Sequence, residues 1–136
     1  MLSLDVIKTD LTNKVKFQQV PIPMTSSDYL GFVVQGLKRL YVDEGIESSY
    51  SLDFNATTNI ISRNLTLTEI EYITVSSEIA FRNQIKDDLS SIVSFSTNAL
   101  SVSNGDKPFK NLNDIITVLE SRLSKLAFKF THKSSL

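Results

Sequence analysis

Three pairs of acidic residues are the clearest starting point for chemistry in this sequence. They are Asp43-Glu44, Glu69-Glu71 and Asp87-Asp88. General acid–base catalysis would require at least one carboxylate of a pair to be buried in a cleft, where its pKa can shift. Each pair is adjacent or two residues apart on an expected helix surface, so we predict that all three carry solvated charge. A cryptic carboxylate site at Asp87 and Asp88 is the weakest of the functional hypotheses.

Other catalytic arrangements lack the residues that they need. The only histidine, His132, lies in the C-terminal sequence THKSSL, and the chain contains no cysteine. A Ser-His nucleophile or a metal site would therefore depend on one residue near a chain end that we expect to be flexible. The four glycines form no phosphate-binding loop. We predict a protein that is not an enzyme, with no catalytic, cofactor-binding or metal-binding residues.

Length and charge narrow the class of protein further. The 136 residues fit one domain, and 14 Lys and Arg against 15 Asp and Glu give a net charge of -1. Without a broad basic field, nucleic-acid binding is not expected to be the main task. No run of about 18 apolar residues is present, and MLSLDVIKTD lacks the features of a signal peptide. We expect the chain to remain in the cytosol where it is made.

A short amphipathic helix is predicted at the start of the chain. Its apolar residues recur at intervals of three and four, as Leu4, Ile7, Leu11 and Val15. The next segment, VKFQQVPIP, has prolines at positions 21 and 23, which stop a helix and favour an extended path. Residues 1–25 are thus predicted to form a helix and an extended N-terminal arm.

A second helix is predicted to begin after Thr25. The Thr25 hydroxyl can cap it, and Asp28, three positions on, completes a capping box. Gly45 is a natural stop. Gly31 and Gly36 lie inside this helix, each at a cost of about 1 kcal/mol relative to alanine. Either a neighbouring backbone that approaches closely or simple tolerance would account for them.

The longest helix is predicted over residues 68–95. It follows a loop or loose hairpin at 46–65, and Thr68 with Glu71 forms its expected capping box. Its apolar residues form a wide band, made of Ile70, Tyr72, Ile73, Val75, Ile79, Ala80, Phe81, Ile85, Leu89, Ile92 and Val93. A helix of this kind packs against more than one partner, either two helices of its own domain or one helix and a neighbouring subunit.

A protruding loop or short β-hairpin is predicted at 96–109. Asn104-Gly105 is a tight-turn signal, and Pro108 cannot extend a central strand. The last helix is predicted over 111–130 with Asn111 as its cap, followed by a flexible tail at 131–136. The fold class is thus mainly α: a small helical bundle over 26–130 with a long loop or short β-hairpin between its two long C-terminal helices.

Three segments together resemble the small neck proteins of tailed bacteriophages, the head-tail connector or head-completion class. They are MTSSDYLGFVVQGLKRLYVDEG at 24–45, LTEIEYITVSSEIAFRNQIKDDLSSIVSFSTNALSV at 67–102 and DKPFKNLNDIITVLESRL at 106–123. The likeness lies in the order of the helices and the loop between the two long ones. It covers more than half of the chain and contains no catalytic signature.

The resemblance implies a virion structural protein that is assembled in the host cytoplasm. It implies a homo-oligomeric ring, of about twelve copies in that class, that docks under the portal protein and meets other neck or tail proteins. Genomic DNA would pass through the channel without sequence-specific binding, and no membrane would be involved. The expected subunit or partner contacts are Leu100, Val102, Asn104, Gly105, Lys107 and Phe109 in the predicted loop, and Phe17, Val20 and Ile22 in the arm.

A second hypothesis comes from a different class of protein. A small cytosolic helical module with a binding or regulatory role would capture one partner helix along the apolar band at 70–93. Gene neighbourhood separates the two hypotheses. Flanking portal, capsid and tail genes favour the neck protein, and a regulatory operon favours the binding module.

Overall fold

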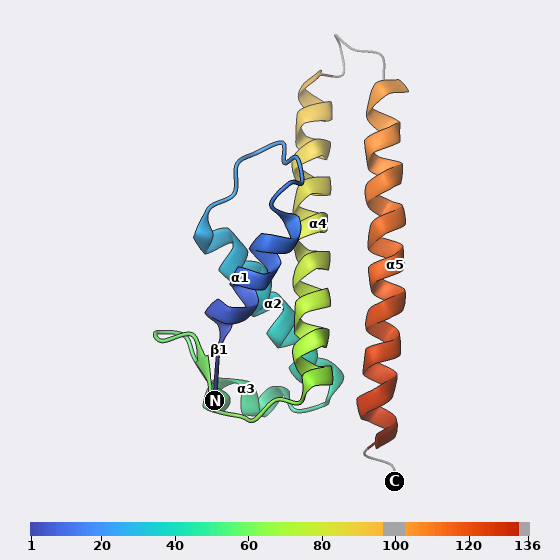
Figure 1. Ribbon diagram of the computed structural model, residues 1–136. Helices are drawn as coiled ribbons and strands as arrows, with labels where there is room; N and C mark the ends of the chain where they lie inside the picture. The colour runs from blue at the N-terminus through green and yellow to red at the C-terminus, as the bar shows by residue number, and fades with distance from the viewer. Residues whose placement is uncertain (97–102, 134–136) are drawn as a thin grey trace.

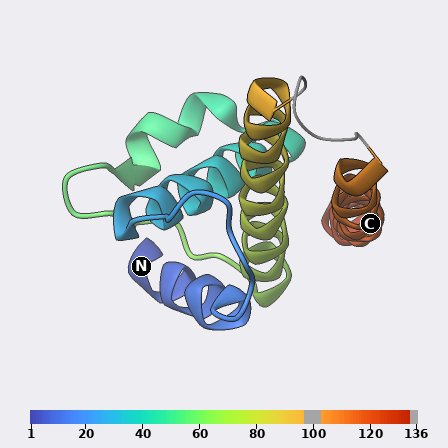
Figure 2. The ribbon, with the colours of Figure 1, turned by 90° about the horizontal axis from the view of Figure 1, so that it is seen from above.

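The computed structural model, which describes residues 1–96 and 103–133, is a bundle built around one long helix (Figure 1). Helices α1 (Leu4–Val15) and α2 (Ser26–Asp43) lie on one side of α4 (Leu67–Ser96). Helix α5 (Ser103–Lys133) runs antiparallel to α4 on its other side, as the view from above shows (Figure 2). The mainly helical fold class is confirmed.

Helices α1 and α2 form where the sequence predicts them. All four apolar residues of the α1 stripe are buried, and the Thr25–Asp28 capping box closes α2 at its start. Gly45, with a φ of 71°, ends α2 in the left-handed conformation that glycine adopts at little cost. The non-helical residues 16–25, here called the connector, lie back against the bundle (Figure 1).

A small antiparallel sheet ties the start of the chain to its middle. After a 3-10 turn (Glu47–Ser49) and the short α3 (Tyr50–Asp53), strands β2 (Phe54–Asn55) and β3 (Ile60–Ile61) form the loose hairpin expected at 46–65. Strand β1 (Leu2–Ser3) pairs with β3, placing Leu2 opposite Ile61 and giving the order β1-β3-β2. Sequence periodicity gave no sign of β1, because two residues are too few to alternate.

Helix α4 begins one residue earlier than predicted, and its capping box is not the expected one. The sequence TLTEIE fits the box pattern twice, at Thr66 with Glu69 and at Thr68 with Glu71. The first pair is the one that forms: Thr66 N donates to Glu69 Oε1 at 2.8 Å, and Glu69 N donates to Thr66 Oγ1 at 3.2 Å. Thr68 and Glu71 therefore lie inside the helix.

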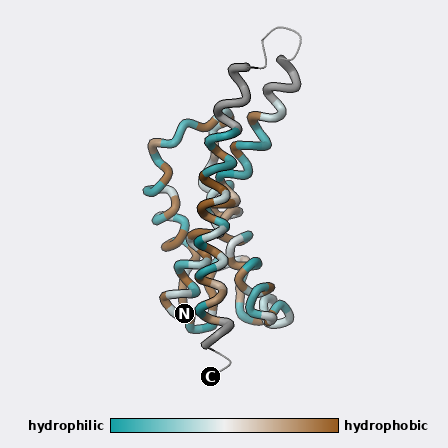
Figure 3. The backbone as a smooth tube through the Cα atoms, turned by 90° about the vertical axis from the view of Figure 1, so that its right-hand side faces the viewer, coloured by the Kyte–Doolittle hydropathy of each residue, from teal (hydrophilic) through white to brown (hydrophobic). Residues whose placement is uncertain are grey.

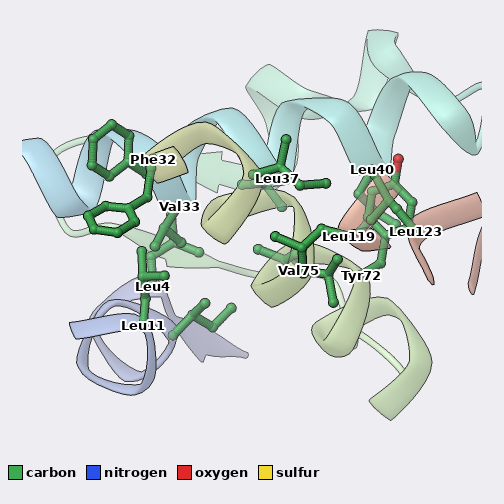
Figure 4. Packing of buried hydrophobic residues seen from close by; sticks show 14 of the residues in the cluster. Leu4, Leu11, Phe32, Val33, Leu37, Leu40, Tyr72, Val75, Leu119 and Leu123 are labelled. Atoms are coloured by element: carbon green, nitrogen blue, oxygen red, sulfur yellow. The ribbon is translucent and has the colours of Figure 1, made fainter. Parts of the chain in front are cut away.

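The wide apolar band of α4 is covered by the chain itself. Tyr72, Ile73, Val75, Ile79 and Phe81 are each at most 2% exposed, because α1, α2 and α5 all pack on this helix (Figure 4). The width of the band is thus explained by three neighbours within one domain. The side chains of Ile92 and Val93 lie outside the described residues.

Gly36 lies where α2 packs closely on the backbone of α4. A Cβ atom at this position would lie 2.8 Å from the carbonyl oxygen of Ile73 and 2.8 Å from Ser77 Oγ. Gly31 is different, since nothing lies within 4 Å of the corresponding point. Close approach therefore explains Gly36, and it does not explain Gly31.

Helix α5 begins at Ser103, which corrects the predicted loop or hairpin at 96–109. Asn104, Gly105 and Pro108 are part of the helix, and only residues 97–102 separate α4 from α5. Turn signals are local preferences worth about 1 to 3 kcal/mol, which tertiary context can override, and here α5 continues alongside α4 (Figure 1). Asn111 is therefore not a cap. The helix also extends through 131–133 of the predicted tail, and 134–136 lie outside the described residues.

Helix α5 attaches to the bundle through one apolar face. Its buried residues are Leu112, Leu119, Leu123 and Leu126, and Figure 3 shows hydrophobic and hydrophilic residues alternating along the helices. Two ion pairs flank that face. The Arg39 guanidinium on α2 donates two bonds to the Glu120 carboxylate, at 3.1 and 2.7 Å, and Arg122 pairs with Glu71 on α4. Among residues 1–96 and 103–133, no helix combines the length and hydropathy needed to cross a bilayer.

Candidate functional site

A buried charge cluster holds the connector against α4. The Glu78 side chain is only 5% exposed, and Lys14 Nζ lies 2.8 Å from its Oε1 atom. Arg82, one turn further along α4, pairs with the same carboxylate at 3.4 Å and donates to Gln18 Oε1 at 2.5 Å. Because Gln18 is in the connector, this chain of contacts fixes where the connector leaves α1.

A groove of about 600 Å³ opens where the connector, α4 and α5 meet. We call it the α5 groove; apolar side chains contribute much of its lining, namely Val20, Pro21, Ile85, Leu89, Leu112 and Ile115. Arg82 and Gln18 lie at the same site. Phe17, directly before this segment, is 90% exposed, with Lys16 Nζ 5.0 Å from the ring centroid. An aromatic side chain left in water beside an apolar groove is typical of an interaction surface.

A second groove of about 410 Å³ lies between the connector, α2 and α4. We call it the α2 groove; the lining residues used below are Ile22, Met24, Asp28, Gly31, Phe32 and Asp88. Asp28 lies in the first turn of α2, and Asp88 lies on α4, where it accepts a bond of 3.0 Å from Gln84. The lining of this groove therefore combines apolar side chains with the polar Ser27, Gln35 and Gln84 and two carboxylates.

The predicted contact residues are only partly brought together. Val20 lines the α5 groove, Ile22 lines the α2 groove and is 48% exposed, and Phe17 lies beside the former. Leu100 and Val102 lie outside the described residues. The backbones of Asn104, Gly105, Lys107 and Phe109 belong to α5, and their side chains lie outside the description. No protein family, curated protein or solved structure compared with the chain matches it.

The prediction that all three acidic pairs are solvated is wrong. Glu69 is 8% exposed at the start of α4, and its carboxylate hydrogen-bonds that of Glu44 at the end of α2. Asp43 accepts a hydrogen bond from the Tyr72 hydroxyl. Asp87 is exposed and Asp88 half-buried. Within the described residues, no group of three or more His, Asp or Glu side chains is placed to hold a metal ion.

The Glu44–Glu69 pair shares one proton. Burial, followed by the hydrogen bond and the charge of Glu69, raises the pKa of Glu44 to about 8, although Arg63 opposes this. Burial alone would raise the pKa of Glu69, but the bonds that it accepts from Glu44 and Thr66 outweigh burial, and its pKa is lowered. Glu44 therefore acts as the donor and Glu69 as the acceptor. Neither residue lines the α2 or the α5 groove, so the pair joins two helix ends.

Replacing Glu44 with glutamine should remove a pH dependence of stability. The folded state keeps a proton on Glu44 up to about pH 8, whereas an ordinary glutamate releases it near 4.5, so Glu44 lowers the stability of the wild type progressively between those values. Glutamine is neutral throughout. Urea unfolding should give the same midpoint for both proteins at pH 4 and a higher midpoint for Glu44→Gln at pH 8.5. The exposed Glu47→Gln is the control, and equal midpoints at both pH values for Glu44→Gln would contradict the shared proton.

Proposed function

We propose that this protein is a structural subunit of the neck of a tailed bacteriophage. In this role it forms a ring beneath the portal protein, extends the DNA channel and offers a platform to the next neck or tail protein. The proposal rests on the order of the helices, which resembles that class, and on one observation of the surface. That observation is the α5 groove, an apolar opening whose lining begins at Gln18, directly after the 90% exposed Phe17.

The physical reasoning is that a single small core leaves these surfaces uncovered. Burying an exposed phenylalanine in an apolar pocket stabilises a complex by about 1.5 to 3 kcal/mol. Phe17 is 90% exposed, so no described part of its own chain covers it, and it belongs to the connector, which the Arg82–Gln18 bond holds in place. An exposed aromatic side chain on a fixed segment, next to an apolar groove, is suited to docking on a preformed partner, because little conformational freedom is lost on binding. The near-neutral net charge of -1 suits a channel wall along which DNA slides.

Mixing the chain with a portal protein and imaging the product by electron microscopy tests the proposal. We expect a ring stacked on the portal. The Phe17→Ala variant should bind the portal about tenfold or more weakly, because exposed aromatic anchors carry a large share of binding energy. Leu52→Ala, at an 84% exposed residue near the opposite end of the bundle, is the matched control and should bind as the wild type does. A chain that binds no portal or neck protein contradicts the proposal.

For the alternative, a small cytosolic binding or regulatory module, the surface open to a partner is smaller than the sequence suggested. Most of the band at 70–93 is buried by α1, α2 and α5, so a partner helix cannot lie along it. Of the apolar residues of the band whose side chains the structure describes, only Ile85 and Leu89 line the α5 groove. Capture of an amphipathic segment there by a chain encoded in a regulatory operon would support the alternative.

A further inference from the structure

One flank of α5 is both apolar and basic. Positions 115, 118, 122, 125 and 129 recur on one side of the helix, and we call Ile115, Val118, Arg122, Lys125 and Lys129 the basic stripe. Val118 is 67% exposed and Ile115 38%. Arg122 pairs with Glu71, whereas Lys125 and Lys129 form no ion pair with another described residue. The stripe therefore offers two apolar side chains followed by two available cations.

The α2 groove has the complementary character. The Asp28 and Asp88 carboxylates have no cation within ion-pair distance among the described residues, and the neighbouring Asp87 is exposed. Ile22 and Met24 supply apolar surface in the same groove. Two apolar side chains and two lysines of a helix would thus meet apolar side chains and two carboxylates, which is the pattern of charge complementarity across an interface.

Gly31 keeps the α2 groove open. A glycine inside a helix costs about 1 kcal/mol relative to alanine, and no contact within the chain requires one here. This is the reverse of Gly36, where an added Cβ would strike the backbone of α4. The missing side chain at Gly31 leaves room at the groove lining for a residue from outside.

We propose that the basic stripe of one copy docks in the α2 groove of a second copy. Within one molecule the two surfaces are separate, because no described residue of α5 lines the α2 groove, and α5 meets α2 at the Arg39–Glu120 pair instead. Pairing two basic stripes, or two acidic grooves, would bring like charges together. The contact is therefore head to tail, the type that builds a ring when its rotation closes. That this contact closes into a ring rests on the proposed function, and the basic stripe and the α2 groove are the two surfaces that would join neighbouring subunits.

Cysteine cross-linking tests the contact, since the chain has no cysteine of its own. A Val118→Cys variant is mixed with a Gly31→Cys variant at high concentration under mild oxidation, alone and on a portal platform. We expect a covalent dimer to form. Val6→Cys, which is 54% exposed on α1, replaces Gly31→Cys in the matched control and should give about tenfold less product. Circular dichroism confirms that each variant is folded.

Charge-reversal variants provide a second, independent test of the contact. Lys125→Glu with Lys129→Glu on the Val118→Cys chain should reduce the cross-linked product about tenfold, and Asp87→Lys with Asp88→Lys on the Gly31→Cys chain should restore it. Equal product with the Val6→Cys control, or no effect of the reversed charges, overturns the interface. Portal docking is scored separately. Docking without this cross-link overturns the inference alone, and the cross-link without docking overturns the neck function alone.

Discussion

Replacing Gly36 with alanine is expected to lower the free energy of unfolding by about 2 kcal/mol, the range for overpacking a close contact. The new methyl group would lie 2.8 Å from the carbonyl oxygen of Ile73, which is backbone and cannot move without shifting α4. It would also meet Ser77 Oγ at 2.8 Å and disturb the 2.6 Å bond that this hydroxyl donates to the same carbonyl. Relief of the clash requires α2 and α4 to separate, so the loss extends beyond one contact.

The matched control is the second glycine of the same helix. Gly31→Ala adds the same methyl group where nothing lies within 4 Å, so we expect a gain of about 0.5 to 1 kcal/mol from helix propensity. Urea unfolding followed by circular dichroism measures both variants. Opposite signs identify the α2–α4 crossing as the constraint on Gly36. A stabilised Gly36→Ala protein would show that the two helices are further apart than described.

Phe81→Ala should have the largest effect of any substitution considered, a loss of about 3 to 5 kcal/mol. The ring is fully buried and forms a three-ring cluster with Tyr29 and Phe32: its centroid is 6.0 Å from each of theirs, and theirs are 6.1 Å apart. Truncation leaves a cavity between α2 and α4 and removes both aromatic contacts. Since domains of this size are stable by only about 5 to 15 kcal/mol, thermal unfolding should shift by tens of degrees or be lost.

Phe17→Ala is the comparison for Phe81→Ala, because the residue type is the same and the surroundings are reversed. At 90% exposure, Phe17 has only the Lys16 ammonium near its ring, and its loss should change the stability by less than about 0.5 kcal/mol. A stable Phe17→Ala protein is also the condition for reading its portal binding as an effect on docking. Comparable destabilisation of both variants would contradict the assigned burial.

The helices that the sequence predicts well are those whose signals agree with each other. Leu4, Ile7, Leu11 and Val15 repeat at helical spacing and are buried, and the Thr25 box and Gly45 mark both ends of α2. Here the local preference and the tertiary packing favour the same conformation. The width of its apolar band also predicted that α4 has more than one neighbour, although it did not predict that three helices of the same chain would cover it.

The sequence-based prediction was wrong where two local conformations are both compatible with the sequence, or where contacts with a distant segment determine the structure. The sequence TLTEIE allows two capping boxes, and the register that forms also brings Glu69 to Glu44 at the end of α2. Asn104-Gly105 reads as a turn, yet the helix that runs beside α4 includes it. Strand β1 depends on β3, far away in the chain. Such choices are set by contacts that local spacing does not contain.

The exposure of the connector could be predicted from the sequence, and its attachment to α4 could not. The exposed apolar residues Phe17 and Ile22 could be suggested from VKFQQVPIP, because prolines hold that segment out of a helix. The partner of the connector could not be predicted, since Arg82 is 64 residues from Gln18 and its sequence context is that of an ordinary surface charge. Glu78 in fact lies between α1 and α4 with two cations beside it. Four-residue spacing between Glu78 and Arg82 was the one available signal.

The one-sided attachment of α5 sets a hierarchy of opening events. Helices α1, α2 and α4 pack on one another, whereas α5 packs chiefly on α4 and reaches α2 mainly through the Arg39–Glu120 pair. The free energy needed to lift α5 alone is therefore smaller than that needed to unfold the molecule. The amide hydrogens of α5 should exchange with solvent when that helix alone detaches. Those of α2 should exchange only when the whole molecule unfolds. A neighbour that clamps α5 from outside would merge the two events into one.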